Sequence, residues 1–396
     1  MIERKNPLTA KVGIFAVAHA TYWAQFDGLF ESIMNFHKDF CSLVSKNNVE
    51  IVDFGMIDSS EKAFDAADKI KAANVDILIC NMATYATSSV FAPIMRSADV
   101  PVILAALQPR SALDYTKANT FMQLENICSV PEFTGVAVRL GKKVSDVILG
   151  TLYNDKEAEE EIARWCSIAN VLHSLKGARI GLMGHVLEAM YDMHADPTAV
   201  AAAFNVHVPL LEVDNVIELY NTVTESEIKE KSELILKEFD TPDPKGDPIT
   251  EKLKDSDLYE AAKTAVALDK LVEKYNLTGL AYYYEGTPES LHRKVSSNFI
   301  VGNSILNAQG IPMCGEYDIK TCIAMLIMDR LNIGGSFAEF HPFDFAGDFI
   351  LAGHDGPHHL RIAEGKPVLR SLAKYHGKPG HGASVEFKIK EGPITM

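Results

Sequence analysis

The chain has 396 residues, of which 47 % are hydrophobic, and it carries a formal net charge of −15. This length predicts two or three domains, and the composition is that of a globular protein with a sizeable core. The negative charge argues against nucleic acid or an anionic membrane surface as a partner, because both attract positive charge. A small neutral or cationic ligand, or a bound cation, fits this charge better.

The sequence lacks an apolar run of transmembrane length and a recognisable signal peptide. Its first residues, MIERKNPLTAKVGIF, lack the long apolar stretch and the small-residue cleavage site of a secreted protein. The cysteines are scattered without a CxxC motif: Cys41, Cys80, Cys128, Cys166, Cys314 and Cys322. We therefore expect a cytoplasmic protein whose thiols are reduced and mostly buried.

Apolar runs alternate with helical patterns through the first hundred residues. Strands are predicted at 11–18, 49–57, 75–82 and 101–107, and helices over 22–45 and 59–73. Strands that are apolar throughout and alternate with helices indicate a parallel sheet covered on both faces.

A long helix is predicted over 154–177, and the alternation then starts again. Further strands are expected at 178–184, 207–214 and 277–286, with helices at 225–239 and 258–275. The repetition of the same pattern predicts two successive α/β units, with a boundary near residue 174.

The pattern changes after a predicted helix at 317–332. The segments SFAEFHPFDF, DFILAGH, KPVLRSLAKY and ASVEFKIKEGPITM alternate apolar and polar residues, as antiparallel strands do. We therefore predict an α/β fold with two successive Rossmann-like α/β domains, 1–174 and 175–331. A mainly antiparallel β domain, 332–396, follows, and we expect it to be incomplete.

Ligand-type residues gather in the last third of the chain. Glu316 lies between a strand-like run and a helix, where it is either a ligand-binding residue or a charge in the first helical turn. Strand alternation places Phe337, Glu339 and His341 on one face, where a carboxylate is costly unless it is paired or bound to metal. If that face is solvated, Glu339 is simply an exposed polar residue.

His354 follows the apolar run FILAG, and a histidine there is more often structural than functional. Together with Glu316 and Glu339 it makes a mixed oxygen and nitrogen set that suits Mn²⁺ or Mg²⁺. His358 and His359 are near enough to support such a site, or they are solvated.

Aromatic and amide side chains follow two early strands. Trp23 and Gln25 lie in the turn AHATYWAQF, and Tyr85 lies in the turn NMATY. Such groups suit sugar hydroxyls, although the aromatic residues could equally pack in the core. The chain has no GxGxxG turn, no Walker-type loop and no GxSxG motif, which argues against a dinucleotide site and a serine hydrolase.

Three segments resemble the L-arabinose isomerase and L-fucose isomerase superfamily. They are GEYDIKTCIAMLIM, SFAEFHPFDF and FILAGHD, and TYWAQF and NMATY are similar to the family's early loops. The resemblance implies two α/β domains, a β-rich C-terminal domain and a homo-oligomer, a trimer or a hexamer. It also implies a divalent cation, usually Mn²⁺ but also Mg²⁺ or Co²⁺, held by two glutamates and two histidines.

The resemblance assigns roles to individual residues. Glu316, Glu339 and His354 would bind the metal, and the two glutamates would move a proton between C1 and C2 of an open-chain pentose or deoxyhexose. This is a metal-dependent aldose–ketose isomerase that works through an ene-diol. Trp23, Gln25 and Tyr85 would contact the sugar.

The second histidine ligand has no counterpart at the family's spacing, and His376 and His381 come earlier in the chain. Two alternatives to the isomerase stay open. One is a non-catalytic cytoplasmic sugar-binding or regulatory protein with the same fold. The other keeps the metal but changes the reaction, to an epimerase or an aldolase-like lyase.

Overall fold

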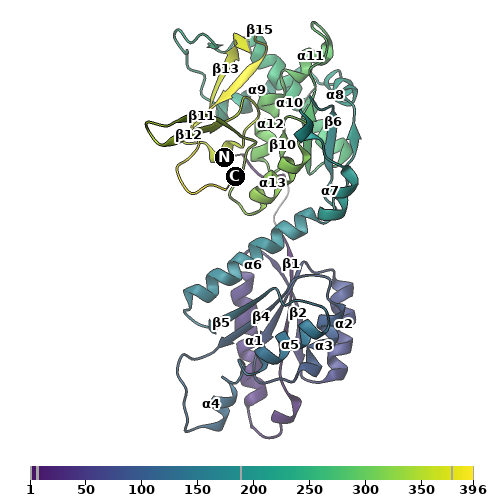
Figure 1. The fold of residues 1–396 in the computed structure, drawn as a ribbon, viewed down its shortest axis with the longest axis vertical. Helices are drawn as coiled ribbons and strands as arrows, with labels where there is room; N and C mark the ends of the chain where they lie inside the picture. Colours follow the sequence, from purple (N-terminus) through teal and green to yellow (C-terminus); the bar gives the residue numbers. More distant parts are fainter. Residues whose placement is uncertain (1, 6–8, 188–189, 376–377, 396) are drawn as a thin grey trace. The chain divides into compact units, whose positions relative to one another are not determined.

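The structure, a computed structural model, describes residues 2–5, 9–187, 190–375 and 378–395. The chain forms two compact units (Figure 1). The first unit is Leu8–His173, and the second is Ser174–Met396 together with Met1–Pro7. The division into three domains stays a prediction.

The first unit is built on a five-stranded sheet in the order β2-β1-β3-β4-β5, with every neighbouring pair parallel. Its strands are β1 (Lys11–Val17), β2 (Glu50–Ile57), β3 (Ile77–Met82), β4 (Val102–Gln108) and β5 (Asp146–Thr151). All residues of β3, and all of β1 except the first, are buried. Such central strands need helices on both faces, which is why they are apolar throughout.

Helices cover both faces of this first sheet. Those of the unit are α1 (Leu29–Ser45), α2 (Ser60–Ala73), α3 (Ala92–Ser97), α4 (Ala118–Met122), α5 (Ser129–Arg139) and α6 (Lys156–Leu175), with short 3₁₀ turns η1 (Ala20–Tyr22) and η2 (Ser88–Val90). One core joins α1 and α6 to the sheet, and another joins α2, α3 and α5 to its opposite face. In the second core Phe91 and Phe133 stack with ring centroids 4.6 Å apart.

The second unit contains a parallel sheet in the order β10-β9-β6-β7. Its strands are β6 (Ile180–Gly184), β7 (Leu210–Leu211), β9 (Gly279–Tyr283) and β10 (Met313–Cys314). The helices are α7 (Pro197–Phe204), α8 (Val213–Tyr220), α9 (Glu225–Glu238), α10 (Asp255–Tyr275), α11 (Leu291–Ser296), α12 (Phe299–Ala308) and α13 (Ile319–Arg330), with turns η3 (Tyr191–Met193) and η4 (Leu360–Ile362). Helices α7 and α13 pack on one face, and α8, α10 and α12 on the other.

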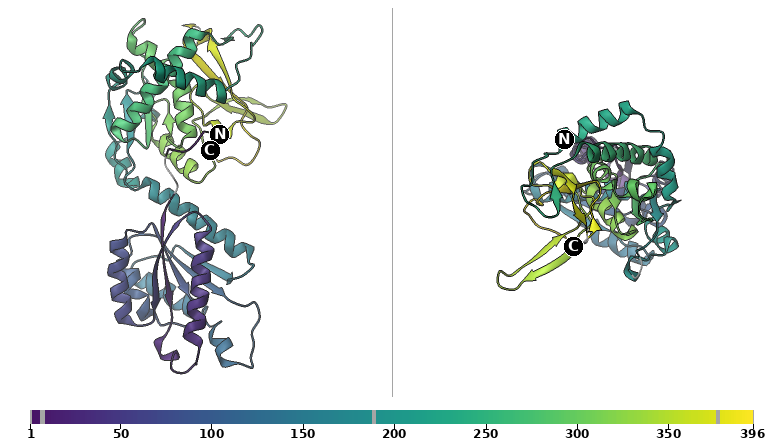
Figure 2. Two further views of the ribbon diagram at one scale, coloured as in Figure 1. Left: turned by 180° about the vertical axis from the view of Figure 1, so that it is seen from behind. Right: turned by 90° about the horizontal axis from the view of Figure 1, so that it is seen from above.

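Antiparallel strands complete the second unit. They are β8 (Thr250–Glu251), β11 (Glu339–Asp344), β12 (Phe349–Gly353), β13 (Val368–Leu372), β14 (Lys374–Tyr375), β15 (Lys378–Pro379) and β16 (Ala383–Glu386). The sheet β16-β13-β8 packs its apolar side chains against α9, α10 and α12. The hairpin of β11 and β12 extends away from the rest of the unit (Figure 2).

The α/β class with parallel sheets is confirmed, but two predicted elements are wrong in detail. The helix predicted over 22–45 begins only at Leu29, because Gly28 at its N-terminus adopts φ +78° and ends a preceding turn. The strand predicted over 207–214 is reduced to Leu210–Leu211, because Glu212 caps the helix α8. Within the described part of the chain, none of the helices has the length and apolar character needed to cross a bilayer.

Candidate functional site

The order of strands in the second unit creates a switch point between β6 and β9. From β6 the chain first adds β7 on one side, and later adds β9 and β10 on the other side. Ligands in open α/β sheets bind beyond the carboxyl ends of the strands at such a point. The segments that follow β6, β9 and β10 therefore make the edge of the sheet where a ligand site is expected.

Gly184 ends β6 at this edge and approaches β9 closely. It adopts φ +90°, and a Cβ atom added there would lie 1.9 Å from the carbonyl oxygen of Tyr283. The next residue, His185, donates its backbone N–H to the same carbonyl over 3.1 Å. Only glycine permits this contact, which holds the segments after β6 and β9 together.

Glu316 follows β10 in a strained turn. Glu316 and Tyr317 adopt φ +56° and +63°, a left-handed conformation that costs non-glycine residues roughly 1–2 kcal/mol each. The N-cap of α13 is Asp318, whose side chain accepts hydrogen bonds from the N–H groups of Lys320 and Thr321. Glu316 therefore lies outside the helix, and its carboxylate does not serve as a first-turn charge.

The Glu316 carboxylate meets His354, which the sequence analysis had placed in the same site. Oε1 of Glu316 lies 3.7 Å from Nε2 of His354, and the two side chains are 20 % and 12 % exposed. The second oxygen, Oε2, is buried and has no hydrogen-bond partner within the described residues. A buried acceptor without a partner is costly, so this atom is a natural contact for a ligand.

Neighbouring rings hold His354 in place. The Phe337 ring meets the His354 ring edge-on, with centroids 4.5 Å apart. Nε2 of His358 lies 2.9 Å from the carbonyl oxygen of His354, to which its N–H donates. Burial lowers the pKa of His358, which favours the neutral imidazole, and its buried Nδ1 has no hydrogen-bond partner among the described residues.

Glu339 does not join this pair. It lies at the start of β11 and is exposed, as is His341, because no layer formed by the described parts of the chain covers the hairpin. Phe337 instead turns into the core, so these residues do not share one buried face. His359 is also not a ligand candidate, because it is buried and lies 3.1 Å from Asp329 through Nε2.

A four-ligand metal centre is therefore not assembled from the predicted residues. Among the described residues, the ligand atoms of Glu316, Glu339 and His354 do not form a group within 4.8 Å of one another. His381 is exposed, and His376 lies outside the described residues.

The first unit has a corresponding switch point between β1 and β3. His19 follows β1, Tyr85 follows β3, and their rings meet edge-on with centroids 6.3 Å apart. The Tyr22 ring lies 5.4 Å from His19 and 6.0 Å from Tyr85. Burial, and then the neighbouring Tyr85, raise the pKa of Tyr22, so this hydroxyl stays protonated.

Trp23 and Gln25, the other predicted sugar contacts, lie beside this cluster in the sequence but differ in setting. The indole Nε1–H of Trp23 donates a hydrogen bond to Asp58 over 2.9 Å. The Trp23 side chain also lines a hollow of about 520 Å³ together with Phe30 and Lys62. Gln25 is exposed. The structure thus brings Tyr85 together with His19 and Tyr22, and it ties Trp23 to Asp58.

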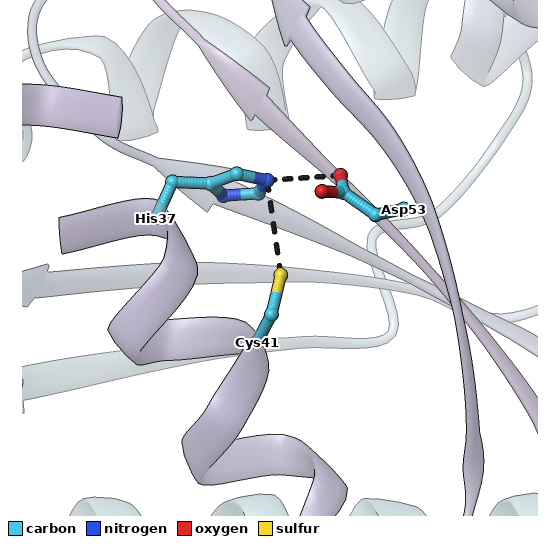
Figure 3. Close-up of side chains that lie close together, drawn as sticks. All are labelled: His37, Cys41 and Asp53. Atoms are coloured by element: carbon cyan, nitrogen blue, oxygen red, sulfur yellow. Dashed lines mark hydrogen bonds and ion pairs between the residues drawn. The ribbon is translucent and has the colours of Figure 1, made fainter. Parts of the chain in front are cut away.

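Sequence analysis missed the group formed by His37, Cys41 and Asp53 (Figure 3). His37 and Cys41 are four residues apart in α1, a spacing that places both on one helix face. This spacing was visible in the sequence. That Asp53 completes the group was not visible in the sequence, because this depends on how β2 packs beside α1.

The comparisons with known proteins found matches only among solved structures. No family model matches the chain, and no curated protein matches it. One similar structure is a substrate-binding protein with adhesive properties from Clostridium difficile, in its ligand-free open form. It is 12 % identical, covers 77 % of this chain and 74 % of its own, and has a TM-score of 0.19. Another is a carbohydrate transporter from Acidothermus cellulolyticus in complex with myo-inositol, 10 % identical over 82 % of this chain and 88 % of its own, with a TM-score of 0.20.

These neighbours are binding and transport proteins, and neither is an isomerase. The predicted aldose–ketose isomerase, and with it the predicted enzyme class, is contradicted by these matches, whereas the predicted divalent cation is not tested by them. At such TM-scores, neither neighbour's ligand site can be transferred to this chain. Glu339 is exposed and does not group with Glu316 and His354, so the described residues do not bring together the two glutamates to which the resemblance assigned the proton transfer.

Proposed function

We propose that the chain is a sugar-binding protein and that the second unit holds a small sugar or polyol beyond the carboxyl ends of β6, β9 and β10. The observation that carries this proposal is the buried Oε2 of Glu316, an acceptor to which none of the described residues donates a hydrogen bond. It lies at the switch point of the sheet, where open α/β folds bind ligands.

The side chains at this edge of the second unit's sheet can form hydrogen bonds with hydroxyl groups. A sugar hydroxyl that donates to Glu316 Oε2 supplies the missing hydrogen bond, which is strong because the acceptor is charged. His354, 3.7 Å from the other carboxylate oxygen, can bond to a second hydroxyl. The partly buried ring of Tyr317 supplies apolar surface for the C–H groups of a sugar.

The strained turn at Glu316 and Tyr317 supports the same function. Two consecutive non-glycine residues in the left-handed region are costly, and residues held in such conformations cluster at active sites and ligand clamps. In the first unit, Tyr85, Trp23 and Gln25 remain proposed sugar contacts, at an edge of the same type.

A divalent cation at Glu316 and His354 is a second proposal. A separation of 3.7 Å between two side-chain ligand atoms is compatible with one ion bound to both. Calorimetric titration with MgCl₂ and CoCl₂ tests it, and an isotherm unchanged by Glu316→Gln contradicts it. The cytoplasmic location remains a proposal too, which fractionation of cells that produce the chain would check.

The proposed function is tested by calorimetry with a panel of pentoses, deoxyhexoses and polyols. The variants are Glu316→Gln, which keeps the shape of the side chain but removes its charge, and Glu339→Gln as the matched control. We expect Glu316→Gln to weaken binding at least tenfold, about 1.4 kcal/mol. Glu339→Gln should bind within twofold of the unmodified chain, because its carboxylate is exposed on the hairpin.

Two results would overturn the proposal. One is that no member of the panel binds at millimolar concentration. The other is that a sugar binds but both variants bind it equally well, which would move the ligand away from Glu316.

A further inference from the structure

The side chains of His37, Cys41 and Asp53 form a compact group in the first unit (Figure 3). His37 and Cys41 come from one face of α1, and Asp53 comes from the neighbouring strand β2. His37 is fully buried, Cys41 is partly buried, and the Asp53 side chain is 45 % exposed. The group is therefore closed on the side of the helix and open to solvent at the carboxylate.

The three ligand atoms converge on one point. Nε2 of His37 lies 2.9 Å from Oδ1 of Asp53 and 3.8 Å from Sγ of Cys41, and all three atoms lie within 4.8 Å of one another. A tetrahedral Zn²⁺ site with bonds of about 2.0–2.3 Å has ligand atoms roughly 3.3–3.7 Å apart. The observed spacings bracket this range, so small side-chain shifts would complete the geometry.

The same arrangement does not suit a nucleophilic cysteine. In a cysteine–histidine–acid triad, the thiol and the acid bond to opposite ring nitrogens. Here both Sγ and Oδ1 face Nε2, while Nδ1 lies 3.1 Å from Nδ2 of Asn81. Burial, and then the neighbouring carboxylate, raise the pKa of Cys41 to about 12, so the free thiol is not a nucleophile near neutral pH.

We propose that His37, Cys41 and Asp53 bind a Zn²⁺ ion, with water as its fourth ligand on the open side. A set of one thiolate, one imidazole and one carboxylate matches the ligands that zinc prefers, whereas Mg²⁺ and Ca²⁺ take oxygen ligands. The ion would fasten the middle of α1 to β2. This site is separate from the proposed sugar site and does not depend on it.

Binding of Zn²⁺ would require the protons of Cys41 and His37 to move. Cys41 releases its thiol proton to solvent when Sγ binds the metal. His37 moves its proton from Nε2 to Nδ1, which leaves Nε2 free for the ion. Asn81 is the positioning residue, because rotation of its amide would present an oxygen to the new Nδ1–H. The carboxylate is already ionised, since the hydrogen bond from His37 lowers the pKa of Asp53.

The test is a titration of the metal-free chain with Co²⁺, a spectroscopic substitute for Zn²⁺. We expect one equivalent to give a near-ultraviolet thiolate-to-cobalt band and the intense visible bands of a four-coordinate ion, both lost when Zn²⁺ is added. Cys41→Ser should abolish the near-ultraviolet band. The matched control, Cys128→Ser, should retain it, because Cys128 is an exposed thiol outside the group.

A second variant distinguishes loss of metal binding from loss of folding. Asp53→Asn changes an exposed carboxylate and should leave the far-ultraviolet circular dichroism unchanged while weakening Co²⁺ binding at least tenfold. Zn²⁺ should raise the melting temperature of the unmodified chain and not that of Asp53→Asn. The proposal is overturned if the unmodified chain gives no thiolate band, or if Cys41→Ser keeps the band that Cys128→Ser loses.

Discussion

Arg4 and Asp329 form an ion pair that joins the beginning of the chain to the end of α13. Nη1 of Arg4 lies 2.6 Å from Oδ2 of Asp329, whose side chain is 2 % exposed. His359 approaches the other carboxylate oxygen at 3.1 Å, and Arg330 is also paired with Oδ2. One buried carboxylate thus holds three partners from separate segments of the second unit.

Asp329→Asn should strongly destabilise the second unit. The substitution leaves Arg330 and Arg4 without their counter-charge, and loss of one partner of a buried pair costs about 3–5 kcal/mol. Urea unfolding followed by circular dichroism measures the change in free energy. Glu391→Gln is the control, because its exposed pair with Lys388 should contribute less than about 1 kcal/mol. Equal effects of the two variants would show that the buried network adds little.

At acid pH, Asp329 should no longer contribute to the free energy of unfolding. Burial alone would raise its pKa, but the hydrogen bonds from His359 and Arg4 and the charge of Arg330 outweigh burial and lower the pKa to about 2. A carboxyl with a pKa below its unfolded value of about 3.9 stabilises the fold above that pH, by on the order of 2 kcal/mol. This contribution is lost as the pH falls from about 4 toward 2.

The difference in unfolding free energy between the unmodified chain and Asp329→Asn measures this effect. We expect the difference to shrink by about 1 kcal/mol between pH 5 and pH 3. A difference that stays constant over this range would mean that the pKa of Asp329 is not lowered by folding.

Sequence patterns predicted the parallel sheets because central strands leave a strong signal. Every position after Lys11 in β1 is buried, and the sequence there is apolar throughout. The patterns failed where one residue ended an element, as Gly28 does before α1 and Glu212 does before α8. Such terminations depend on backbone angles and caps, which hydrophobic periodicity does not register.

The candidate site was predictable only in part. The position of Glu316 after a strand-like run placed it correctly at the edge of the sheet, and the polar pair with His354 followed from the same part of the chain. Alternation around Glu339 could not reveal whether another layer covers the hairpin, and none does among the described residues. The group around His37 needed the pairing of α1 with β2, which is a tertiary relationship.

The exposed apolar side chains of the β11–β12 hairpin lead us to predict that the chain self-associates. These side chains include Phe343 at 60 % and Phe345 at 92 % exposure, and within the described ranges the hairpin's two strands pair only with each other. Because exposed apolar surface is costly in water, we expect this part of the hairpin to be covered by a partner. If the expected trimer or hexamer uses it, Phe343→Ser with Phe345→Ser should shift the chain toward monomer in analytical ultracentrifugation. An unchanged sedimentation coefficient would exclude the hairpin from the interface.

Gly184→Ala should destabilise the second unit and disturb the proposed ligand site at the carboxyl ends of β6 and β9. The new Cβ would lie 1.9 Å from the carbonyl oxygen of Tyr283, a backbone atom that cannot move without shifting β9. We expect a loss of more than about 2 kcal/mol, measured by urea unfolding. Gly177→Ala is the control: it also has positive φ, +73°, but its Cβ would meet nothing within 4 Å. That control should lose only about 1 kcal/mol, the cost of the left-handed backbone.

Glu316→Gly should make the second unit more stable while it removes ligand binding. Glycine relieves the strain at φ +56° and also removes the buried oxygen that lacks a partner. We expect a gain of about 1 kcal/mol in unfolding free energy, together with loss of any sugar affinity shown by the unmodified chain.

Glu289→Gly separates the two contributions to this gain. Glu289 has φ +64° but an exposed side chain, so this control relieves only backbone strain. A larger gain for Glu316→Gly than for Glu289→Gly would show the cost of burying the Oε2 atom of Glu316 without a partner among the described residues. If Glu316→Gly instead destabilises the unit, its contact with His354 contributes more to folding than the strain costs. Glu316 would then be retained for stability, and its proposed role in binding would have to be carried by another residue at the edge.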